Sequence, residues 1–227
     1  MQKKINFIDL GKHPITNNFL SLSNPKNEFF YNLKLIFHCE TKLVSLAKFV
    51  SPKKMFNEKY AHRASASKTI QLAYKKLAKL IKKEYKPKSI LEIGSNDGVF
   101  IKHFKDINNL GVEPCKNLAR ITKKMGIKTY DDFWTYKLSE KIIKKNKRFD
   151  VIYSANTISH IHNLDETFRA INNSLNDNGI FILEDPSLFE VIKNTSYDQF
   201  YDEHAYVFSI TELKNITEKS GLKIFKI

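Results

Sequence analysis

The chain has 227 residues, the length of one average domain with a smaller attachment. Its hydrophobic content of 42% suits a packed core, and no apolar run reaches the ~18 residues that a membrane-spanning helix needs. A formal charge of +14 is compatible with nucleic-acid binding, but the excess is mostly scattered lysine, so we expect no nucleic-acid and no membrane partner.

The N-terminus and the cysteines bear on location. The first residues reach Asp9 before the apolar segment of a secretory signal develops. Cys39 and Cys115 form no CxxC pair and no disulfide framework. Both observations predict a cytoplasmic protein.

Residues 1–64 predict a small, irregular N-terminal lobe with some β-structure. Leu10-Gly11 and Pro14 indicate turns, whereas Tyr31–Phe37 indicates a strand. From residue 65 the pattern changes to a helical period that ends before Pro87. We therefore place a domain boundary between residues 64 and 65, and assign residues 65–227 to a second domain.

Short apolar strands alternate with helices through this second domain, which predicts a mostly parallel α/β sheet with right-handed crossovers. The predicted strands are Ser89–Ile93, Leu110–Glu113, Ile127–Tyr130, Phe149–Ser154, Ile180–Glu184 and Leu222–Ile227. The predicted helices between them are Phe100–Lys105, Asn117–Lys124, Leu138–Lys145, Leu164–Leu175 and Thr211–Lys219.

The loop after the first of these strands predicts a ligand site. Glycines let a backbone approach a ligand, and a following helix would present unpaired N–H groups. The spacing differs from the G-x-G-x-x-G of dinucleotide sites. Glu92, just before the loop, suits the cationic amino-acid end of S-adenosylmethionine. The loop consists of Gly94, Ser95, Asn96, Asp97 and Gly98.

The ends of the next strands supply the remaining contacts expected for this cofactor. Glu113, with Pro114 after it, lies about 20 residues past the loop, where a carboxylate can accept both ribose hydroxyls. We expect Asp132 to bind the adenine amino group and Phe133 to flank the ring. Two positions expected beside the methyl donor follow the fourth strand, Ala155 and Asn156. Open α/β sheets bind ligands at these ends, so the sequence predicts S-adenosylmethionine as cofactor.

Four segments resemble the sugar C-methyltransferases that modify nucleotide-linked deoxy-keto-sugars. Residues 92–98 resemble their E-I-G-S-N-D-G loop, and residues 10–19 resemble L-G-x-x-P-x-x-N-x-F. Residues 60–67 resemble Y-x-Y-x-S-S-x-S, with His62 and Ala64 as departures. Residues 197–204 resemble Y-D-Q-x-Y-x-E-H almost throughout and are the most specific match.

The resemblance implies a Rossmann-like class I methyltransferase core and a nucleotide-sugar as the small-molecule substrate. Tyr201, Glu203, His204 and His160 correspond to active-site positions of that family, and Tyr60 would reach in from the N-terminal lobe. A histidine pKa lies near working pH, so we expect His204 to be the base that forms an enolate beside a ketone. Tyr201 and His160 would hydrogen-bond the substrate or its oxyanion.

Several of these residues also have purely structural interpretations. His160 is compatible with a histidine that satisfies backbone groups after the fourth strand. Tyr60 and His62 are compatible with ordinary packing. Ser65 and Ser67 are as compatible with capping of the helix that follows as with a phosphate-binding role.

Two departures from the family stand out. The family opens with a four-cysteine zinc knuckle, but here the first CxxC is absent and Lys42 replaces the partner of Cys39, so we expect no metal. Family members also continue into another α/β domain, and in their core the last strand is antiparallel and inserts between the fifth and sixth. This chain ends on the predicted sixth strand, so we expect a missing C-terminal domain or a completing partner chain.

Other functions remain compatible with the sequence. An O- or N-methyltransferase of another small molecule fits the same scaffold, and the lost zinc ligands and His62 permit such a change. A non-catalytic binding module fits the charge and the absent last strand. An RNA methyltransferase is the weakest alternative, because residues 155–158 lack the N-P-P-Y-type signature of amino-group methylation.

Overall fold

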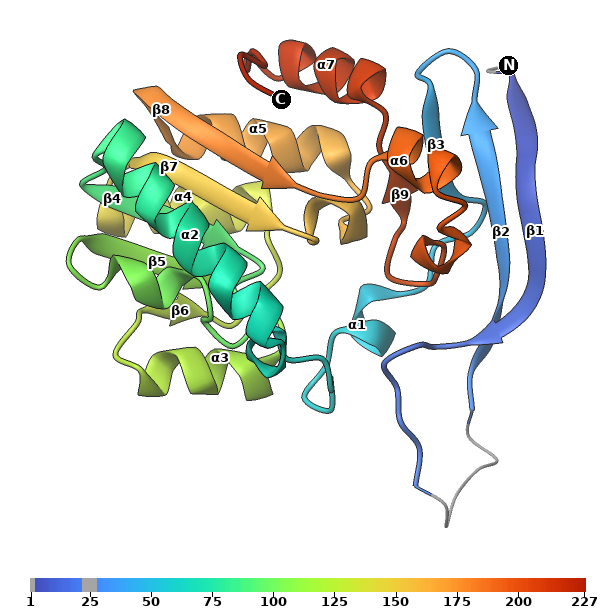
Figure 1. Cartoon of the computed structure of the whole chain (residues 1–227), viewed down its shortest axis with the longest axis horizontal. Helices are drawn as coiled ribbons and strands as arrows, with labels where there is room; N and C mark the ends of the chain where they lie inside the picture. The colour runs from blue at the N-terminus through green and yellow to red at the C-terminus, as the bar shows by residue number, and fades with distance from the viewer. Residues whose placement is uncertain (1–2, 22–27) are drawn as a thin grey trace. The chain divides into compact units, whose positions relative to one another are not determined.

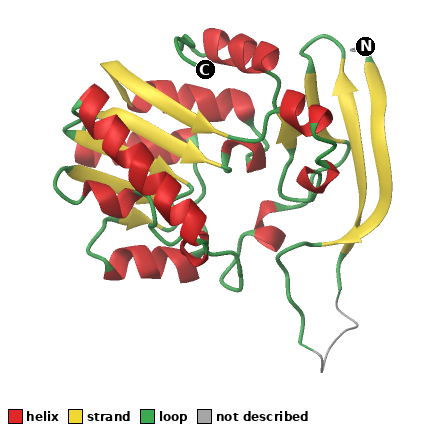
Figure 2. Cartoon of the chain, viewed as in Figure 1, coloured by secondary structure: helices red, strands yellow, loops and turns green. Residues whose placement is uncertain are grey.

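The computed structural model describes residues 3–21 and 28–227 and divides the chain into two compact units. Unit 1 comprises Met1–Met55, Asn156–Phe168 and Asp185–Ile227. Unit 2 comprises Phe56–Ala155 and Arg169–Glu184. Each unit contains its own β-sheet, and Figure 2 shows the strands and helices of both.

Unit 2 is built on a five-stranded, entirely parallel sheet with the order β6-β5-β4-β7-β8. The strands are β4 (Ser89–Ile93), β5 (Asn108–Val112), β6 (Thr129–Tyr130), β7 (Phe149–Ala155) and β8 (Leu175–Glu184). The strand order reverses at β4, with β5 on one side and β7 on the other. Ligands of open α/β sheets bind outside the carboxyl ends of the strands at such a reversal.

The helices of unit 2 precede the sheet or connect its strands. They are η2 (Ala64–Ala66), α2 (Lys68–Tyr85), η3 (Ile101–Phe104), α3 (Lys116–Lys124) and α4 (Tyr136–Asn146), while α5 (Leu164–Ser174) runs from unit 1 into unit 2. Helix α2 lies across one face of the sheet (Figure 1) and buries Ala78 and Ile81 in the same core as Phe100 and Tyr153. The Ser67 side chain caps α2 by accepting from Ile70 N–H. The predicted α/β fold is thereby confirmed.

Unit 1 contains a four-stranded antiparallel sheet in the order β1-β2-β3-β9. The strands are β1 (Lys4–Pro14), β2 (Phe30–His38), β3 (Leu43–Leu46) and β9 (Tyr206–Val207). Its helices are α1 (Pro52–Met55), η4 (Ile158–His160), α6 (Leu188–Lys193), η5 (Tyr197–Gln199) and α7 (Ile210–Lys219). A core of Leu33, Leu35, Val44, Val207 and Phe200 joins the sheet to α6 and the segment after η5.

The prediction of turns near residues 10–14 was wrong, because β1 continues through them to Pro14. Its pairing with β2 shifts register between Asp9 and Lys12, and Gly11 within this bulge has φ of 79°. A glycine in the left-handed region is a standard component of an antiparallel bulge, so the glycine marks a kink within a strand.

Two further element predictions were wrong. Residues 222–227, predicted as a sixth parallel strand, form no strand in the structure. Residues 100–105, predicted as a helix after the glycine loop, contain only the single 3-10 turn η3. The alternating pattern of residues 222–227 therefore finds no pairing partner among the described residues.

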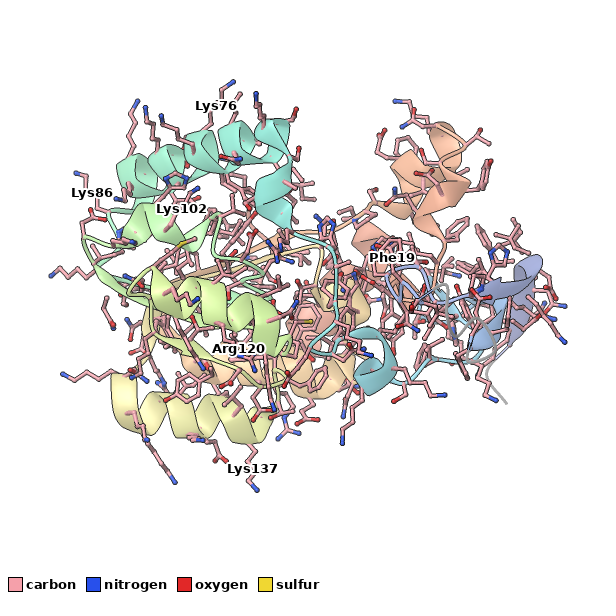
Figure 3. All side chains as sticks on the ribbon, turned by 90° about the horizontal axis from the view of Figure 1, so that it is seen from below. Phe19, Lys76, Lys86, Lys102, Arg120 and Lys137 are labelled. Carbon is pink, nitrogen blue, oxygen red and sulfur yellow. The ribbon has the colours of Figure 1, made fainter. Side chains whose placement is uncertain are left out.

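Basic side chains of unit 2 are distributed over several of its elements. In Figure 3, Lys76 on α2, Arg120 on α3 and Lys137 on α4 point outward. The same view shows Lys86 and Lys102. Within the described ranges, no helix combines the length and apolar character needed to cross a bilayer.

Candidate functional site

The loop after β4 has the backbone of a ligand cradle. Gly94, Asn96 and Gly98 have φ of 76°, 47° and 80°. The Gly94 and Ser95 N–H groups donate to the Val112 carbonyl at 2.8 and 3.0 Å, which ties the loop to the end of β5. A Cβ at Gly98 would lie 3.1 Å from two atoms of the Thr122 side chain on α3. Glycine is therefore needed at position 98 for both its conformation and its close approach to α3.

Asn96 is held at each of its polar groups. Its N–H donates to Glu113 Oε2 at 2.8 Å, and its carbonyl accepts from Thr122 Oγ1 at 3.1 Å. Its side-chain Oδ1 accepts from Ala64 N–H at 3.0 Å, and its Nδ2 donates to the His62 carbonyl at 3.3 Å. The loop is thus fixed by β5, by α3 and by the segment that precedes α2.

Asp97 binds the same preceding segment. Its Oδ2 accepts from Ser65 Oγ at 2.5 Å, and both carboxylate oxygens lie 3.3 Å from Ser65 N–H. The sequence left both Ser65 and Ser67 open between helix capping and phosphate binding. In the structure Ser67 is the cap of α2, whereas Ser65 binds the loop. Thr122 was missed altogether, since its helical position carries no local signal.

Three buried carboxylates surround this loop. Glu92, Asp97 and Glu113 are 4%, 2% and 5% exposed. Burial raises the pKa of Glu92 well above its usual range, and the nearby Glu113 and Asp97 charges raise it further. Among the described residues no donor reaches Glu92 Oε2. A buried concentration of negative charge is stabilised by a cation, and a ligand with sulfonium and ammonium groups would supply one.

Glu113 is oriented by the backbone around it. Its Oε1 accepts from Cys115 N–H and its Oε2 from Asn96 N–H, each at 2.8 Å. These bonds lower the pKa of Glu113, but burial outweighs them and raises it overall. Each carboxylate oxygen can accept more than one hydrogen bond, so acceptor capacity remains for a diol such as a ribose.

The other predicted cofactor residues follow β5, β6 and β7. Pro114 and Phe133 are half-buried, and Asp132 is exposed with its Oδ1 accepting from Phe133 N–H at 2.9 Å. Ala155 ends β7, and Asn156, with φ of 46°, is the next residue and begins a segment of unit 1. Their predicted contacts with adenine and with the methyl donor stay predictions.

Tyr60 belongs to unit 2, where it is packed rather than exposed. Its side chain is 7% exposed and lies in a small core with Cys115 and Leu118. Its carbonyl accepts from Asn117 Nδ2 at 2.9 Å, and Glu58 nearby forms ion pairs with Lys116 and Arg120 of α3. The segment preceding α2 is therefore attached to α3 as well as to the glycine loop.

A second cluster of predicted residues lies in unit 1. His204 is 3% exposed, and its Nδ1 lies 2.7 Å from the Gln199 carbonyl. A carbonyl only accepts, so Nδ1 carries the proton and Nε2 presents a lone pair. Tyr201 OH lies 3.1 Å from Nε2 and is therefore the donor. The His160 ring centroid is 5.2 Å from that of His204.

Burial sets the protonation of this cluster. It lowers the pKa of His204, although the hydrogen bond to the Gln199 carbonyl opposes the change. Burial and the nearby Glu203, Asp202 and Asp185 charges raise the pKa of Tyr201. At neutral pH the pair is therefore a neutral imidazole that accepts from a protonated phenol, which is the state a general base requires.

The two acidic residues between Tyr201 and His204 are bound by the N-terminal segment. Asp202 Oδ1 accepts from Thr16 N–H at 3.1 Å and from Thr16 Oγ1 at 2.7 Å. Glu203 Oε1 accepts from Asn17 Nδ2 at 2.7 Å. The motifs at residues 10–19 and 197–204, far apart in sequence, are thus in direct contact, which sequence reasoning did not anticipate.

The N-terminal lobe lacks the cysteine pattern of a zinc knuckle. Cys39 is the only cysteine before residue 115, and Lys42 Nζ donates to its carbonyl at 2.6 Å. Over the ranges that the structure describes, no three His, Cys, Asp or Glu side chains gather as metal ligands. A tetrahedral structural zinc needs four such ligands, so the donor set does not fit this metal.

Comparison with known proteins gives matches over both parts of the chain. Residues 60–227 match the family described as "Methyltransferase domain", and residues 1–56 match one described as "Putative zinc binding domain". The C-methyltransferase NovU of Streptomyces niveus is 24% identical over 229 residues, which cover 98% of this chain and 54% of that protein. The chain therefore spans about half the length of this curated relative.

Solved structures share the fold at lower identity. A SAM-dependent methyltransferase from Archaeoglobus fulgidus matches with a TM-score of 0.53 and 18% identity, over 66% of this chain and 68% of that one. The plantazolicin methyltransferase BamL, solved with a desmethylPZN analog and SAH, matches with a TM-score of 0.53 and 16% identity, over 69% and 64% of the two chains.

Fold and loop together define a class I S-adenosylmethionine-dependent methyltransferase core. The chain belongs to the methyltransferase-domain family, whose profile covers residues 60–227. S-adenosylmethionine is the cofactor of this domain.

Proposed function

We propose that the protein transfers the methyl group of S-adenosylmethionine to a carbon atom of a nucleotide-linked keto-sugar, with His204 as the base. The hydrogen-bonded pair of Tyr201 and His204 carries this proposal, because its tautomer leaves Nε2 as the proton acceptor. The similarity to a protein named as a C-methyltransferase, and the motif at residues 197–204, favour carbon over oxygen or nitrogen as the acceptor.

The proposed reaction begins with proton abstraction beside the sugar ketone. His204 Nε2 takes the proton from the carbon next to the carbonyl, and the Tyr201 hydroxyl turns from Nε2 to donate to the developing enolate oxygen. With S-adenosylmethionine bound, the enolate carbon would accept the methyl group, and S-adenosylhomocysteine would leave with the carbon–sulfur electron pair. The bound cofactor supplies the electrophilic methyl group, and His160 and Glu203 border the base.

The proposed cofactor contacts follow from the polar groups around the loop. Glu92 and the loop residues 94–98 would bind the amino-acid end, and Glu113 would accept the ribose hydroxyls. Asp132 and Phe133 would contact adenine, and Ala155 and Asn156 would lie beside the methyl group. The domain boundary between residues 64 and 65 stays a prediction. The role of Tyr60 in substrate binding also stays a prediction, although its side chain is packed in the core of Cys115 and Leu118.

Calorimetric titration with S-adenosylmethionine and S-adenosylhomocysteine tests the cofactor site. We expect saturable binding that Glu113→Ala abolishes, with Asp132→Ala as a second variant at the adenine end. Circular dichroism of each variant establishes that it is folded. Absence of binding by the folded wild-type chain would remove the basis of the proposal.

A product assay tests the acceptor. The chain is incubated with nucleotide-linked keto-sugars and cofactor that carries a ¹³C-labelled methyl group, and the product is analysed by NMR. Coupling of the labelled methyl to a ring carbon supports C-methylation. A methyl signal on oxygen or nitrogen would instead assign the protein to the O- or N-methyltransferases on the same scaffold.

A further inference from the structure

The segment Tyr201–His204 has no regular secondary structure of its own. It lies between η5 and β9, so its backbone is not fixed by a helix or by neighbouring strands along its length. Its conformation depends instead on individual hydrogen bonds to other parts of unit 1. Side chains can adopt catalytic geometry only when such supporting contacts fix them.

Thr16 and Asn17 supply several of these contacts. Three donors reach two adjacent carboxylates, with donor–acceptor distances of 3.1, 2.7 and 2.7 Å. Asp202 and Glu203 are 1% and 2% exposed, so these bonds replace water around buried charges. On β2, burial raises the pKa of Tyr31, and the nearby Asp202 charge raises it further. We name the three bonds from Thr16 and Asn17 the clasp.

The clasp fastens the segment on one side, and β3 fastens it on the other. The Ala205 carbonyl, directly after His204, accepts from Leu46 N–H at 2.9 Å. His204 thus lies between two attachment points, the clasp at residues 202–203 and the sheet at residue 205. Loss of the clasp leaves the attachment at residue 205 and the bond from His204 Nδ1 to the Gln199 carbonyl. The backbone before His204 is then held less tightly, and we expect the imidazole to sample more than one orientation.

We propose that Asn17 is a positioning residue for the Tyr201–His204 pair, and that Thr16 assists it, by holding Glu203 and Asp202 away from the imidazole. The effect of the clasp on catalysis rests on the proposed function, because it requires His204 to be the base. The clasp does not depend on the identity of the substrate.

The groups that face the pair come from several segments. Three carboxylates raise the pKa of Tyr201: Glu203, Asp202 and Asp185. Two further titratable groups lie nearby. The His160 ring neighbours that of His204, and Tyr31 is close to Asp202. If the clasp is lost, water enters and Glu203 gains freedom to approach the imidazole. Both changes favour the protonated imidazole, so both raise the pKa of His204 from its lowered value toward the ordinary ~6.5.

The test is NMR of the full chain with ¹⁵N-labelled histidine, with the His204 signals assigned by loss in His204→Gln. Wild-type protein should show one Nδ1–H tautomer and a lowered pKa. Asn17→Ala should show a mixture of tautomers and a pKa near the ordinary value. Asn18→Ala is the matched control, because the Asn18 backbone N–H donates to the Ile15 carbonyl and alanine keeps that bond, so this variant should behave as wild type.

Thr16→Val and Thr16→Ser complete the design. Thr16→Val removes only the hydroxyl donor, and it replaces Asn17→Ala as the test variant if Asn17→Ala does not fold. Thr16→Ser keeps a hydroxyl donor at this position, so its His204 titration should equal that of wild type. A folded Asn17→Ala or Thr16→Val protein whose His204 tautomer and pKa equal those of wild type overturns the inference. A different result is that the variants alter the His204 titration but the chain methylates no keto-sugar. That result would support the role of the clasp and contradict the proposed function.

Discussion

At the scale of single residues, the pairing of His204 with Tyr201 gives the most direct test of the chemistry. General acid–base catalysis contributes about 10²–10⁴-fold in rate, so we expect His204→Gln to lower kcat by that amount with little change in cofactor affinity. Steady-state kinetics and calorimetry measure the two quantities. His162→Gln is the matched control, because burial also lowers the pKa of His162 but its ring stacks on Phe49. Equal losses in both variants would argue against His204 as the base.

Glu92 gives a prediction for the pH dependence of cofactor binding. Its pKa is raised by burial and by two neighbouring carboxylates, so a proton and the cationic cofactor compete for the same carboxylate. The dissociation constant for S-adenosylmethionine should therefore fall as pH rises through this pKa and level off above it. Calorimetry in buffers with different ionisation enthalpies should show proton release on binding.

Glu92→Gln serves as the control for this linkage, since it keeps the shape of the side chain and removes the titration. We expect weaker binding and no proton release linked to this site. For the ligand-free protein the sign is opposite: a raised pKa means that folding takes up a proton, so stability decreases as pH rises through it. Identical proton release in the variant would show that another group is titrating.

At the scale of elements, the glycine loop and α3 should depend on each other. A residue with a side chain in the left-handed region costs about 1–2 kcal/mol, and overpacking typically costs another 1–3 kcal/mol. Gly98→Ala incurs both penalties, whereas Gly126→Ala incurs only the first, since Gly126 has φ of 79° and open space around it. Urea denaturation should show the larger loss for Gly98→Ala, and only this variant should bind the cofactor more weakly.

Adding Thr122→Ser to Gly98→Ala provides a compensating variant. It removes the methyl group that the new Cβ would meet but keeps the hydroxyl that donates to the Asn96 carbonyl. Part of the lost stability should return. If the double variant is no more stable than Gly98→Ala, the contact with α3 is not the source of the penalty.

Periodicity in the sequence predicted much of unit 2 because β4 and β7 are largely buried and α3 and α4 each have an apolar face. The predictions for β4, α3, α4 and β7 agree with the structure to within a few residues. The sequence pattern failed at two places where the surroundings decide the structure. Gly11 lies in a bulge rather than a turn, and residues 222–227 carry a strand pattern but form no strand in the described part of the chain. Strand formation depends on a neighbouring edge, which no local pattern encodes.

The candidate site shows the same division. The glycine loop, Glu113 and the motif at residues 197–204 are local in sequence and were found there. The contacts of Thr16, Asn17 and Thr122 depend on how distant segments pack, although Asn17 lies within a recognised motif. The Nδ1–H tautomer of His204 follows from a carbonyl whose position only the fold provides.

At the scale of the whole molecule, the missing zinc ligands imply a different source of stability for the N-terminal lobe. Its sheet is continuous through β1, β2, β3 and β9, and the apolar core of unit 1 lies against it. We therefore expect a chelator to leave the melting temperature unchanged, and elemental analysis to find no stoichiometric zinc. A chelator-induced fall in melting temperature would show that the lobe recruits metal in another way.

The clasp also has a consequence for synthesis. It joins residues that are 186 positions apart in the sequence. Strand β3 likewise cannot pair with β9 until a segment of similar length has been synthesised. At about 5–20 residues per second, a ribosome needs on the order of ten to forty seconds to deliver the second partner. During that time β3 presents an unpaired edge to other nascent chains. The yield of folded protein in a cell should therefore depend on translation speed and chaperone supply as much as on the stability of the finished molecule.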